Sequence, residues 1–280
     1  MKSMDICVIG DNCIDIIKEE SEFEYPGGNG VNTSVALSRL GNSVSFVGVV
    51  GNDDRGMTVR ENLINEDVDI SRLKVAEGRT AWTEIQLEKG ERKFVDEDLG
   101  VQQSFELDQD DFDYLSKFGW VHHTGFTNWT SAFEGNSNRF FIGIANQISN
   151  IIKEVPGVSV DFSNVNYREF LSSIGNRVGI GFFSRDRMNY QEAQAEIQSI
   201  EKQYFDDIVI TMGEYGSYGF NGQYLTYQCS DSVNVVSTLG AGDAFIGAYL
   251  DAFLQNQRQS DCLEAGSKYA GKVCESISAF

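Results

Sequence analysis

The chain has 280 residues, 41% of them hydrophobic, and a formal net charge of −20 at pH 7. This length fits one large domain with a sizeable core. Such an acidic surface would repel nucleic acid, whose phosphates a binding protein has to neutralise, and the sequence has no run of about 20 apolar residues that could span a membrane.

The first residues and the rare residue types narrow the class of protein further. Residues 1–5, MKSMD, precede the first apolar run without the apolar core of a signal peptide, so we expect a cytoplasmic protein. The five cysteines are scattered with no Cys-x-x-Cys pair, which predicts free buried thiols rather than disulfides or a zinc site. The adjacent His122 and His123 would point to opposite faces of a strand, one exposed and one buried.

Short apolar runs alternate with helical patterns along the whole chain. We expect strands at 6–9, 46–50, 120–123, 158–162, 178–183 and 208–212, and helices between them, for instance at 29–40, 54–66 and 190–203. Continuous apolar strands separated by helices are typical of a parallel sheet covered on both faces. The sequence therefore predicts a doubly wound α/β fold, in which ligands bind beyond the carboxyl ends of strands, where Asp11, Asp161 and Gly213 fall.

Two stretches break this rhythm. Residues 12–23 continue from the first strand with further apolar positions, and residues 80–95 alternate around the turn Lys89-Gly90-Glu91. The second stretch is typical of a β-hairpin.

Residues 26–32, PGGNGVN, predict a tight turn that opens a buried helix ending before Gly41. Asn29 and Asn32 are three residues apart, so they share one side of the first turn. Buried amides need hydrogen-bond partners. Either these two only cap the helix, or they bind a polyhydroxylated ligand.

Residues 237–245, STLGAGDAF, are the most informative stretch. The two glycines let the backbone approach a bulky anion, and the apolar pattern that follows places them at a helix N-terminus, where unpaired N–H groups and the helix dipole favour phosphate. A carboxylate beside a phosphate cradle, here Asp243, makes sense as a base that takes a proton from an attacking hydroxyl. The alternative is an ordinary glycine turn with an aspartate as dipole partner.

Together the two glycine-rich stretches resemble the PfkB (ribokinase-like) family of sugar and nucleoside kinases, which has an N-terminal Gly-Gly-Asn signature and a C-terminal Asp-Thr-x-Gly-Ala-Gly-Asp signature. The resemblance covers nearly the whole chain and implies a single kinase domain, 1–280, with a three-layer α/β/α fold and a small β lid. The lid would come from about 12–25 and 80–100. In the family such strands cover the sugar and often serve as a dimer clasp, so a homodimer through the lid is an expectation; an ordinary edge hairpin is the alternative.

The resemblance also implies roles for individual residues. The activity would be ATP-dependent phosphorylation of a primary hydroxyl of a sugar, with Mg²⁺ and, as a further candidate, K⁺. The catalytic set would be Asp243 as base and the backbone N–H groups of Gly240, Ala241 and Gly242 around the transferring phosphoryl group. The sugar would be bound by Asp11, Asp15, Gly28, Asn29, Asn32 and Arg92. The nucleotide would be bound by Thr211, Gly213, Gly216 and Thr238.

Two departures from the family pattern stand out. Ser237 occupies the place of the leading Asp in the C-terminal signature, which puts loop geometry or cation handling in question. The family's Asn-x-x-Glu segment, linked to Mg²⁺ and phosphate, has no clean counterpart after the strand at 178–183; the metal ligands are unknown, with Asp186 and Glu192 as candidates.

Several acceptors fit the sequence. The opening segment GDNCIDI at 10–16, with the short lid, is most similar to fructoselysine 6-kinase-like members, so fructoselysine or another fructosamine is the expected sugar. The alternatives are fructose, a 2-keto-3-deoxy sugar acid or a nucleoside. A sugar- or nucleotide-binding regulator with weakened catalysis is the alternative of another class. A NAD-binding enzyme is disfavoured, because no Gly-x-Gly-x-x-Gly follows the first strand.

Overall fold

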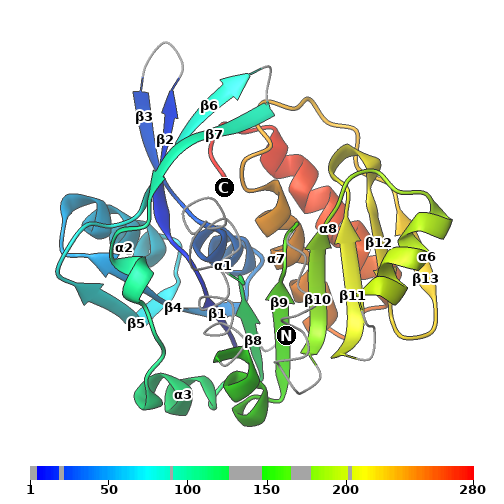
Figure 1. Cartoon of the computed structure of the whole chain (residues 1–280), viewed down its shortest axis with the longest axis horizontal. Coiled ribbons are helices and arrows are strands. Elements are labelled where there is room, and N and C mark those ends of the chain that lie inside the picture. Colours follow the sequence, from blue (N-terminus) through cyan, green and yellow to red (C-terminus); the bar gives the residue numbers. More distant parts are fainter. Residues whose placement is uncertain (1–4, 19–21, 89–90, 126–146, 165–177, 201–203) are drawn as a thin grey trace.

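The computed structural model describes residues 5–18, 22–88, 91–125, 147–164, 178–200 and 204–280 (Figure 1). One large sheet contains β1 (Asp5–Ile9), β4 (Ser43–Gly51), β5 (Asp69–Ala76), β8 (Trp120–His123), β9 (Gly157–Asp161), β10 (Val178–Ser184), β11 (Phe205–Thr211), β12 (Ser217–Phe220) and β13 (Leu225–Gln228). The nine strands are ordered β13-β12-β11-β10-β9-β8-β1-β4-β5. Neighbours from β11 to β5 are parallel, whereas β12 and β13 form an antiparallel edge.

Helices cover both faces of this sheet. Within the described residues they include α1 (Asn29–Arg39), α2 (Asp54–Asn65), α3 (Gln109–Leu115), α6 (Tyr190–Ser199), α7 (Ala241–Leu254) and α8 (Gln259–Cys274). Strand β1 alternates between the two layers: Ile6 and Val8 pack in the core with α1, α2, α7 and α8, whereas Cys7 and Ile9 pack in the core with α3 and α6. The result is a three-layer α/β/α arrangement with an apolar core on each side of the sheet.

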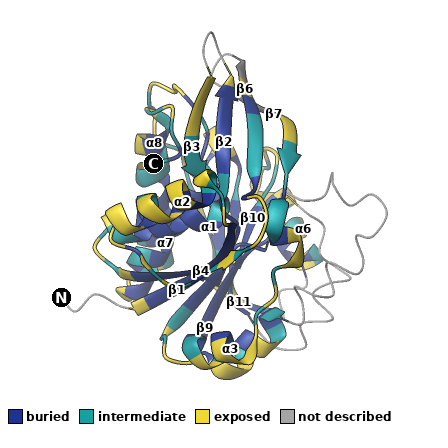
Figure 2. Ribbon diagram, turned by 90° about the vertical axis from the view of Figure 1, so that its left-hand side faces the viewer, coloured by how far each residue is buried: buried dark blue, intermediate teal, exposed yellow. Residues whose placement is uncertain are grey.

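A second, four-stranded sheet stands beyond one end of the large sheet (Figures 1 and 2). It contains β2 (Cys13–Lys18), β3 (Glu22–Gly27), β6 (Trp82–Glu88) and β7 (Glu91–Asp98), in the order β3-β2-β6-β7. Two antiparallel hairpins are joined by the parallel pair β2 and β6. Ile17 and Ile85 pack against Leu239 and Ala279, so this small sheet rests on the loop that leads into α7.

The expected strands and helices are present, with ends displaced by a few residues. Strand β5 was not expected, because its position at the sheet edge leaves seven of its eight residues partly buried or exposed and gives no continuous apolar run. The short strands β12 and β13 were missed as well. All five cysteines are free, although Cys229 is exposed.

The expectation for the histidines was wrong. Both His122 and His123 are fully buried, because β8 lies inside the sheet and helices cover both of its faces. Burial lowers the pKa of His122 to about 3 and that of His123 to about 4. His122 Nδ1 lies 2.9 Å from the Ser159 hydroxyl, and Gly125 N–H donates to His123 Nδ1 at 2.9 Å. Both rings are therefore neutral structural groups.

Candidate active site

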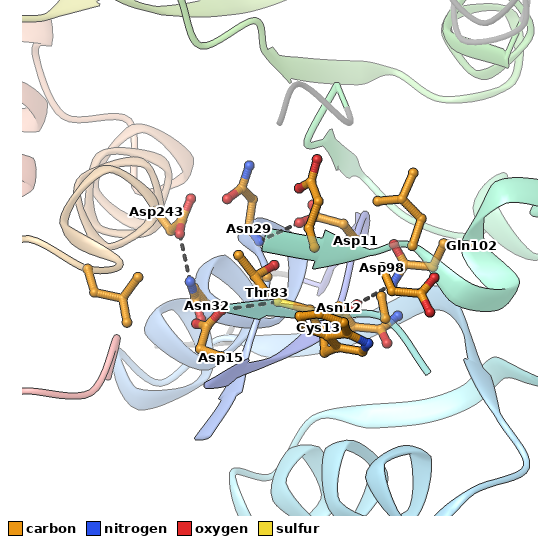
Figure 3. A pocket seen from close by; sticks show the side chains of 16 residues that line it. Asp11, Asn12, Cys13, Asp15, Asn29, Asn32, Thr83, Asp98, Gln102 and Asp243 are labelled. Atoms are coloured by element: carbon orange, nitrogen blue, oxygen red, sulfur yellow. Dashed lines mark hydrogen bonds between the residues drawn. The ribbon is translucent and has the colours of Figure 1, made fainter. Parts of the chain in front are cut away.

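A cleft opens between the small sheet and the carboxyl ends of β1 and its neighbours, with about 520 Å³ of empty space including its open mouth (Figure 3). Six residues singled out in the sequence line it: Asp11, Asp15, Gly28, Asn29, Asn32 and Asp243. The side chain of Arg92 lies outside the described residues. The fold therefore brings the two glycine-rich stretches into one site.

Asp243 and Asn32 meet in this cleft. Asn32 lies in the first turn of α1 and donates from Nδ2 to Oδ2 of Asp243, in the first turn of α7, at 2.8 Å. Both side chains are buried, with exposures of 4% and 8%. Because a carboxylate only accepts hydrogen bonds, this contact fixes the orientation of the amide. The carbonyl oxygen of Asn32 faces no donor within the described part of the chain.

Asp11 lies two residues beyond β1 and organises the start of α1. Its Oδ2 accepts the Asn29 N–H and its Oδ1 accepts the Thr124 hydroxyl, each at 2.9 Å. Burial raises the pKa of Asp11 above its ordinary value, and these hydrogen bonds oppose the shift. The backbone of Asn29 is therefore bound within the protein, while its side chain lines the cleft.

Asp15 lies in β2, in the small sheet, and is 4% exposed. Its carboxylate packs against Gly27, where a Cβ atom would come within 2.0 Å of Oδ2. The Cys13 thiol donates to its Oδ1 at 3.3 Å. The glycine at 27 therefore leaves the room that Asp15 needs to line the cleft.

Asp161 is a further carboxyl group near Asp11, at the end of β9. It is 8% exposed, and Ser163 N–H donates to its Oδ1 at 2.7 Å. Burial, together with the nearby charge of Asp11, raises the pKa of Asp161 to about 7. It does not line the cleft, although it ends the strand next to β8.

The loop before α7 has the features of an anion cradle. Gly240 has a left-handed conformation with φ of 73°, and a Cβ atom there would lie 2.4 Å from the Ala279 carbonyl oxygen. A Cβ atom at Gly242 would meet nothing within 4 Å among the described residues. Ala241 N–H donates to the Thr238 carbonyl at 3.3 Å, which leaves Gly242 as the better placed donor at this helix start.

Ser237 takes part in the same loop. Its buried hydroxyl accepts the Leu239 N–H at 3.1 Å, a turn that an aspartate in this place would form with its carboxylate. The change from the family's Asp therefore preserves the hydrogen bond that shapes this loop, while it removes a charge.

The four residues expected to bind nucleotide lie away from the cleft. Thr211 ends β11, and its hydroxyl lies 3.2 Å from that of Ser184. Gly213 and Gly216 follow in a turn with φ of 55° and 84°, conformations that glycine adopts easily. Thr238 lies in the loop before α7.

The expectation that an Asn-x-x-Glu segment is lacking was wrong. Asn189-Tyr190-Gln191-Glu192 has that spacing and opens α6 after β10. Asn189 accepts the N–H groups of Gln191 and Glu192, and the Glu192 carboxylate accepts the Asn189 N–H at 2.7 Å. Within the described ranges, no group of three or more His, Cys, Asp or Glu residues is arranged so that it could hold a metal ion.

Sequence reasoning missed several polar residues of the cleft, among them Asn12, Thr83, Glu97, Asp98 and Gln102. The last three follow the hairpin at 80–95, and only the pairing of β6 with β2 brings them over β1. Gln102 donates from Nε2 to the backbone carbonyl of Asn12 and so attaches this side of the cleft to the segment that follows β1. The run of three acidic residues at 96–98 is the sequence signal that could have pointed to this part of the cleft.

Comparisons with known proteins agree with this arrangement. The model of the "pfkB family carbohydrate kinase" matches residues 4–279. The fructoselysine 6-kinase of Escherichia coli K12 is 26% identical over 272 residues, which cover 96% of this chain and 97% of that protein. A fructosamine kinase of Bacillus subtilis is 28% identical over 281 residues, covering 99% and 93%.

Among solved structures, the ribokinase of Arabidopsis thaliana in complex with ribose and ATP superimposes with a TM-score of 0.80 at 18% identity, covering 98% of this chain and 94% of that one. This likeness confirms the expected ribokinase-like α/β fold. In the part of the chain that the structure describes, no helix is both long and apolar enough to cross a membrane.

Proposed function

The chain belongs to the pfkB family of carbohydrate kinases and is a sugar kinase, and we propose that it transfers the γ-phosphoryl group of ATP to a primary hydroxyl of a fructosamine such as fructoselysine. The observation that carries the proposal is the contact between Asn32 and Asp243, which joins a sugar-side helix start to an anion-side helix start in one cleft.

Asp243 would act as the base. The sugar hydroxyl gives its proton to the Asp243 carboxylate as its oxygen forms a bond to the γ-phosphorus, and the bond from that phosphorus to the β-phosphate oxygen breaks to release ADP. A carboxylate is a weak base toward an alcohol, but in a loose transition state the proton leaves late. Asn32 holds the carboxylate in place, because its amide can donate to Oδ2 throughout.

The sugar would be oriented by the polar groups of the cleft. Asp11 and Asp15 accept hydrogen bonds from hydroxyl groups, and Asn29 and Asn32 offer amides from the first turn of α1. Holding the acceptor hydroxyl beside the base supplies much of the rate enhancement in such a reaction, because phosphoryl transfer depends mostly on positioning and charge stabilisation.

The anion side would bind the phosphates of ATP at the start of α7. Gly242 N–H points from a helix N-terminus, and the open space beside its Cα fits a phosphoryl group. When bound, Mg²⁺ would neutralise charge on the phosphates. We prefer the segment from Asn189 to Glu192 over Asp186 as the candidate that would hold Mg²⁺ beside the nucleotide, because it resembles the family's Asn-x-x-Glu.

Two further features remain proposals that rest on the family resemblance. Thr211, Gly213, Gly216 and Thr238 would flank the nucleotide. The small sheet would act as the lid over the sugar and as the contact surface of a homodimer, and K⁺ would serve as an additional ion.

The proposal is tested by following ADP release with a panel of acceptors, namely fructoselysine, fructose, ribose, 2-keto-3-deoxygluconate and adenosine, in the presence of ATP, Mg²⁺ and K⁺. We expect the highest kcat/KM with fructoselysine. Faster turnover of fructose or of the sugar acid would mean that this compound is the substrate in place of fructoselysine, and the assignment as a sugar kinase would stand. Silence with every acceptor, with ATP binding retained, would favour a regulator, and Ser237→Asp would then test whether the missing charge explains the loss.

A further inference from the structure

We propose that Glu97 and Asp98, at the end of β7, bind the protonated amine of the substrate and thereby select amine-bearing sugars over neutral or acidic ones. The inference rests on the proposed sugar kinase function and assigns a specificity role to two residues of the same cleft. Both residues line the cleft and both are partly buried.

The position of Asp98 fits one end of such a substrate. In Figure 3, Asp98 lies beside Gln102 at one end of the cleft, and Asp243 lies at the other end. A sugar whose reacting hydroxyl reaches Asp243 therefore extends its far end toward β7. In a 1-amino-1-deoxyketose that is phosphorylated on its 6-hydroxyl, the amine and the reacting oxygen are at opposite ends of the sugar. The placement of Asp98 and Asp243 at opposite ends of the cleft matches this pattern.

The charge of the cleft points to the same kind of ligand. Five lining residues carry carboxyl groups, namely Asp11, Asp15, Glu97, Asp98 and Asp243, and of the sixteen residues found to line it none is Lys or Arg. Carboxylates gathered in a partly buried space repel one another and favour a cation between them. The same field repels the carboxylate of a sugar acid, so it discriminates against that competitor.

The side-chain oxygen of Asn12, at the end of the cleft where Asp98 lies, is an acceptor without a described donor. Asn12 is fully buried, its Nδ2 donates to the Val49 carbonyl at 2.9 Å, and its backbone carbonyl accepts from Gln102. Since the Val49 carbonyl can only accept, the orientation of the amide is set and Oδ1 is left as an acceptor. That oxygen has no donor within the described ranges. A buried acceptor without a partner is unfavourable, so this wall is suited to an N–H or O–H donor from a ligand.

The orientation of Asp98 is also set in advance. Its Oδ1 accepts the Gly100 N–H at 2.9 Å, which holds the carboxylate at the start of the 3₁₀ turn at Gly100–Ser104. A preorganised carboxylate loses little freedom when it binds a cation.

The test compares Glu97→Gln, Asp98→Asn and the double variant with Asp96→Asn. Asp96 is exposed, lies on the same strand and does not line the cleft, so its variant is a matched charge control. Asp98→Asn keeps an oxygen for the Gly100 N–H, which preserves the turn. For each variant, kcat/KM is measured with fructoselysine and with fructose.

We expect the ratio of kcat/KM for fructoselysine over fructose to fall by about tenfold in each single variant and further in the double variant, which corresponds to the loss of one charge-assisted contact each. Asp96→Asn should keep the wild-type ratio. In the wild-type enzyme, kcat/KM for fructoselysine should also decrease as pH rises through the pKa of its amine, and this dependence should weaken in the double variant. An unchanged ratio in all variants would overturn the assignment.

The outcomes separate this inference from the proposed function. Efficient turnover of fructose with no preference for fructoselysine would overturn the inference and leave the sugar kinase intact. If no sugar is turned over, the proposed function fails, and calorimetric titration with the two sugars decides the inference. A binding preference for fructoselysine that the double variant loses would support it, and equal binding of both sugars would overturn it.

Discussion

The side-chain amide of Asn32 donates a 2.8 Å hydrogen bond to the carboxylate of Asp243, across 211 residues of sequence. Helices α1 and α7 can make this contact because they approach closely: a Cβ atom at Gly247 would lie 2.7 Å from the Cβ atom of Ala36. The two helix starts therefore face the same space, and Asn32, which we propose binds the sugar, also positions the proposed base Asp243.

Asp243→Asn is the most direct test of the proposed base. The amide keeps the shape of the side chain and an oxygen that can accept from Asn32, so the fold and sugar binding should be retained. Because the variant cannot take the proton, we expect kcat to fall by roughly 10³-fold, within the usual range for removal of a general base. The measurement is kcat by ADP release, together with the dissociation constant of the sugar by calorimetry.

Asp251→Asn is a matched control, since Asp251 lies in the last turn of the same helix and accepts from Asn42 at 2.9 Å. It should keep near-normal turnover. Near-normal turnover in Asp243→Asn itself would contradict the assignment of the base.

The two glycines before and within α7 should respond differently to substitution by alanine. At Gly240 the φ of 73° and the nearby Ala279 carbonyl make a Cβ unfavourable, so Gly240→Ala should unfold about 1–3 kcal/mol more easily. At Gly242 a Cβ meets nothing among the described residues, so Gly242→Ala should keep the wild-type free energy of unfolding. It should nevertheless raise the KM for ATP, because the added methyl group occupies the proposed phosphate space.

Urea unfolding and steady-state kinetics of both variants check this contrast. Full activity in Gly242→Ala would show that the transferring phosphoryl group binds elsewhere.

The sequence was sufficient to predict those parts of the site whose conformation is determined by a short segment alone. The glycine turns at 26–32 and 237–245 open helices by local rules, so Asn32 and Asp243 could be assigned before any contact was known. Glu97 and Asp98 could not, because their place in the cleft depends on the pairing of β6 with β2, a contact between strands about 70 residues apart. Burial of both histidines likewise depends on which strands flank β8, which no local pattern encodes.

Gly27→Ala should disturb the sugar side of the site through Asp15. An added Cβ would lie 2.0 Å from Oδ2 of Asp15, so the carboxylate would have to turn away from the cleft. We expect the KM for the sugar to rise by about tenfold, the equivalent of one lost hydrogen bond to a charged group, with a smaller change in kcat. Gly119→Ala is the control, since a Cβ there meets no described residue within 4 Å. An unchanged KM for the sugar would mean that Asp15 does not contact it.

The pKa of Asp161, raised to about 7 by burial, predicts how stability depends on pH. The ordinary value is 3.8, so between about pH 4 and pH 7 the folded protein keeps a proton that the unfolded chain has lost. Because the folded state binds more protons than the unfolded state in this window, low pH favours folding. The contribution of Asp161 to the free energy of unfolding therefore decreases as pH rises from about 4 to about 7, by up to about 1.4 kcal/mol per pH unit. Above pH 7 the contribution is constant.

Asp161→Asn removes this contribution while it keeps an oxygen for the Ser163 N–H. The free energy of unfolding of the variant minus that of the wild type should therefore increase from pH 4 to pH 7 and then level off. Urea titrations of both proteins at half-unit pH steps measure this difference, in which the titration of distant groups cancels. A difference that stays constant over the window would mean that Asp161 is ionised in the folded protein at low pH, and that the charges of Asp161 and Asp11 are both accommodated beside the cleft.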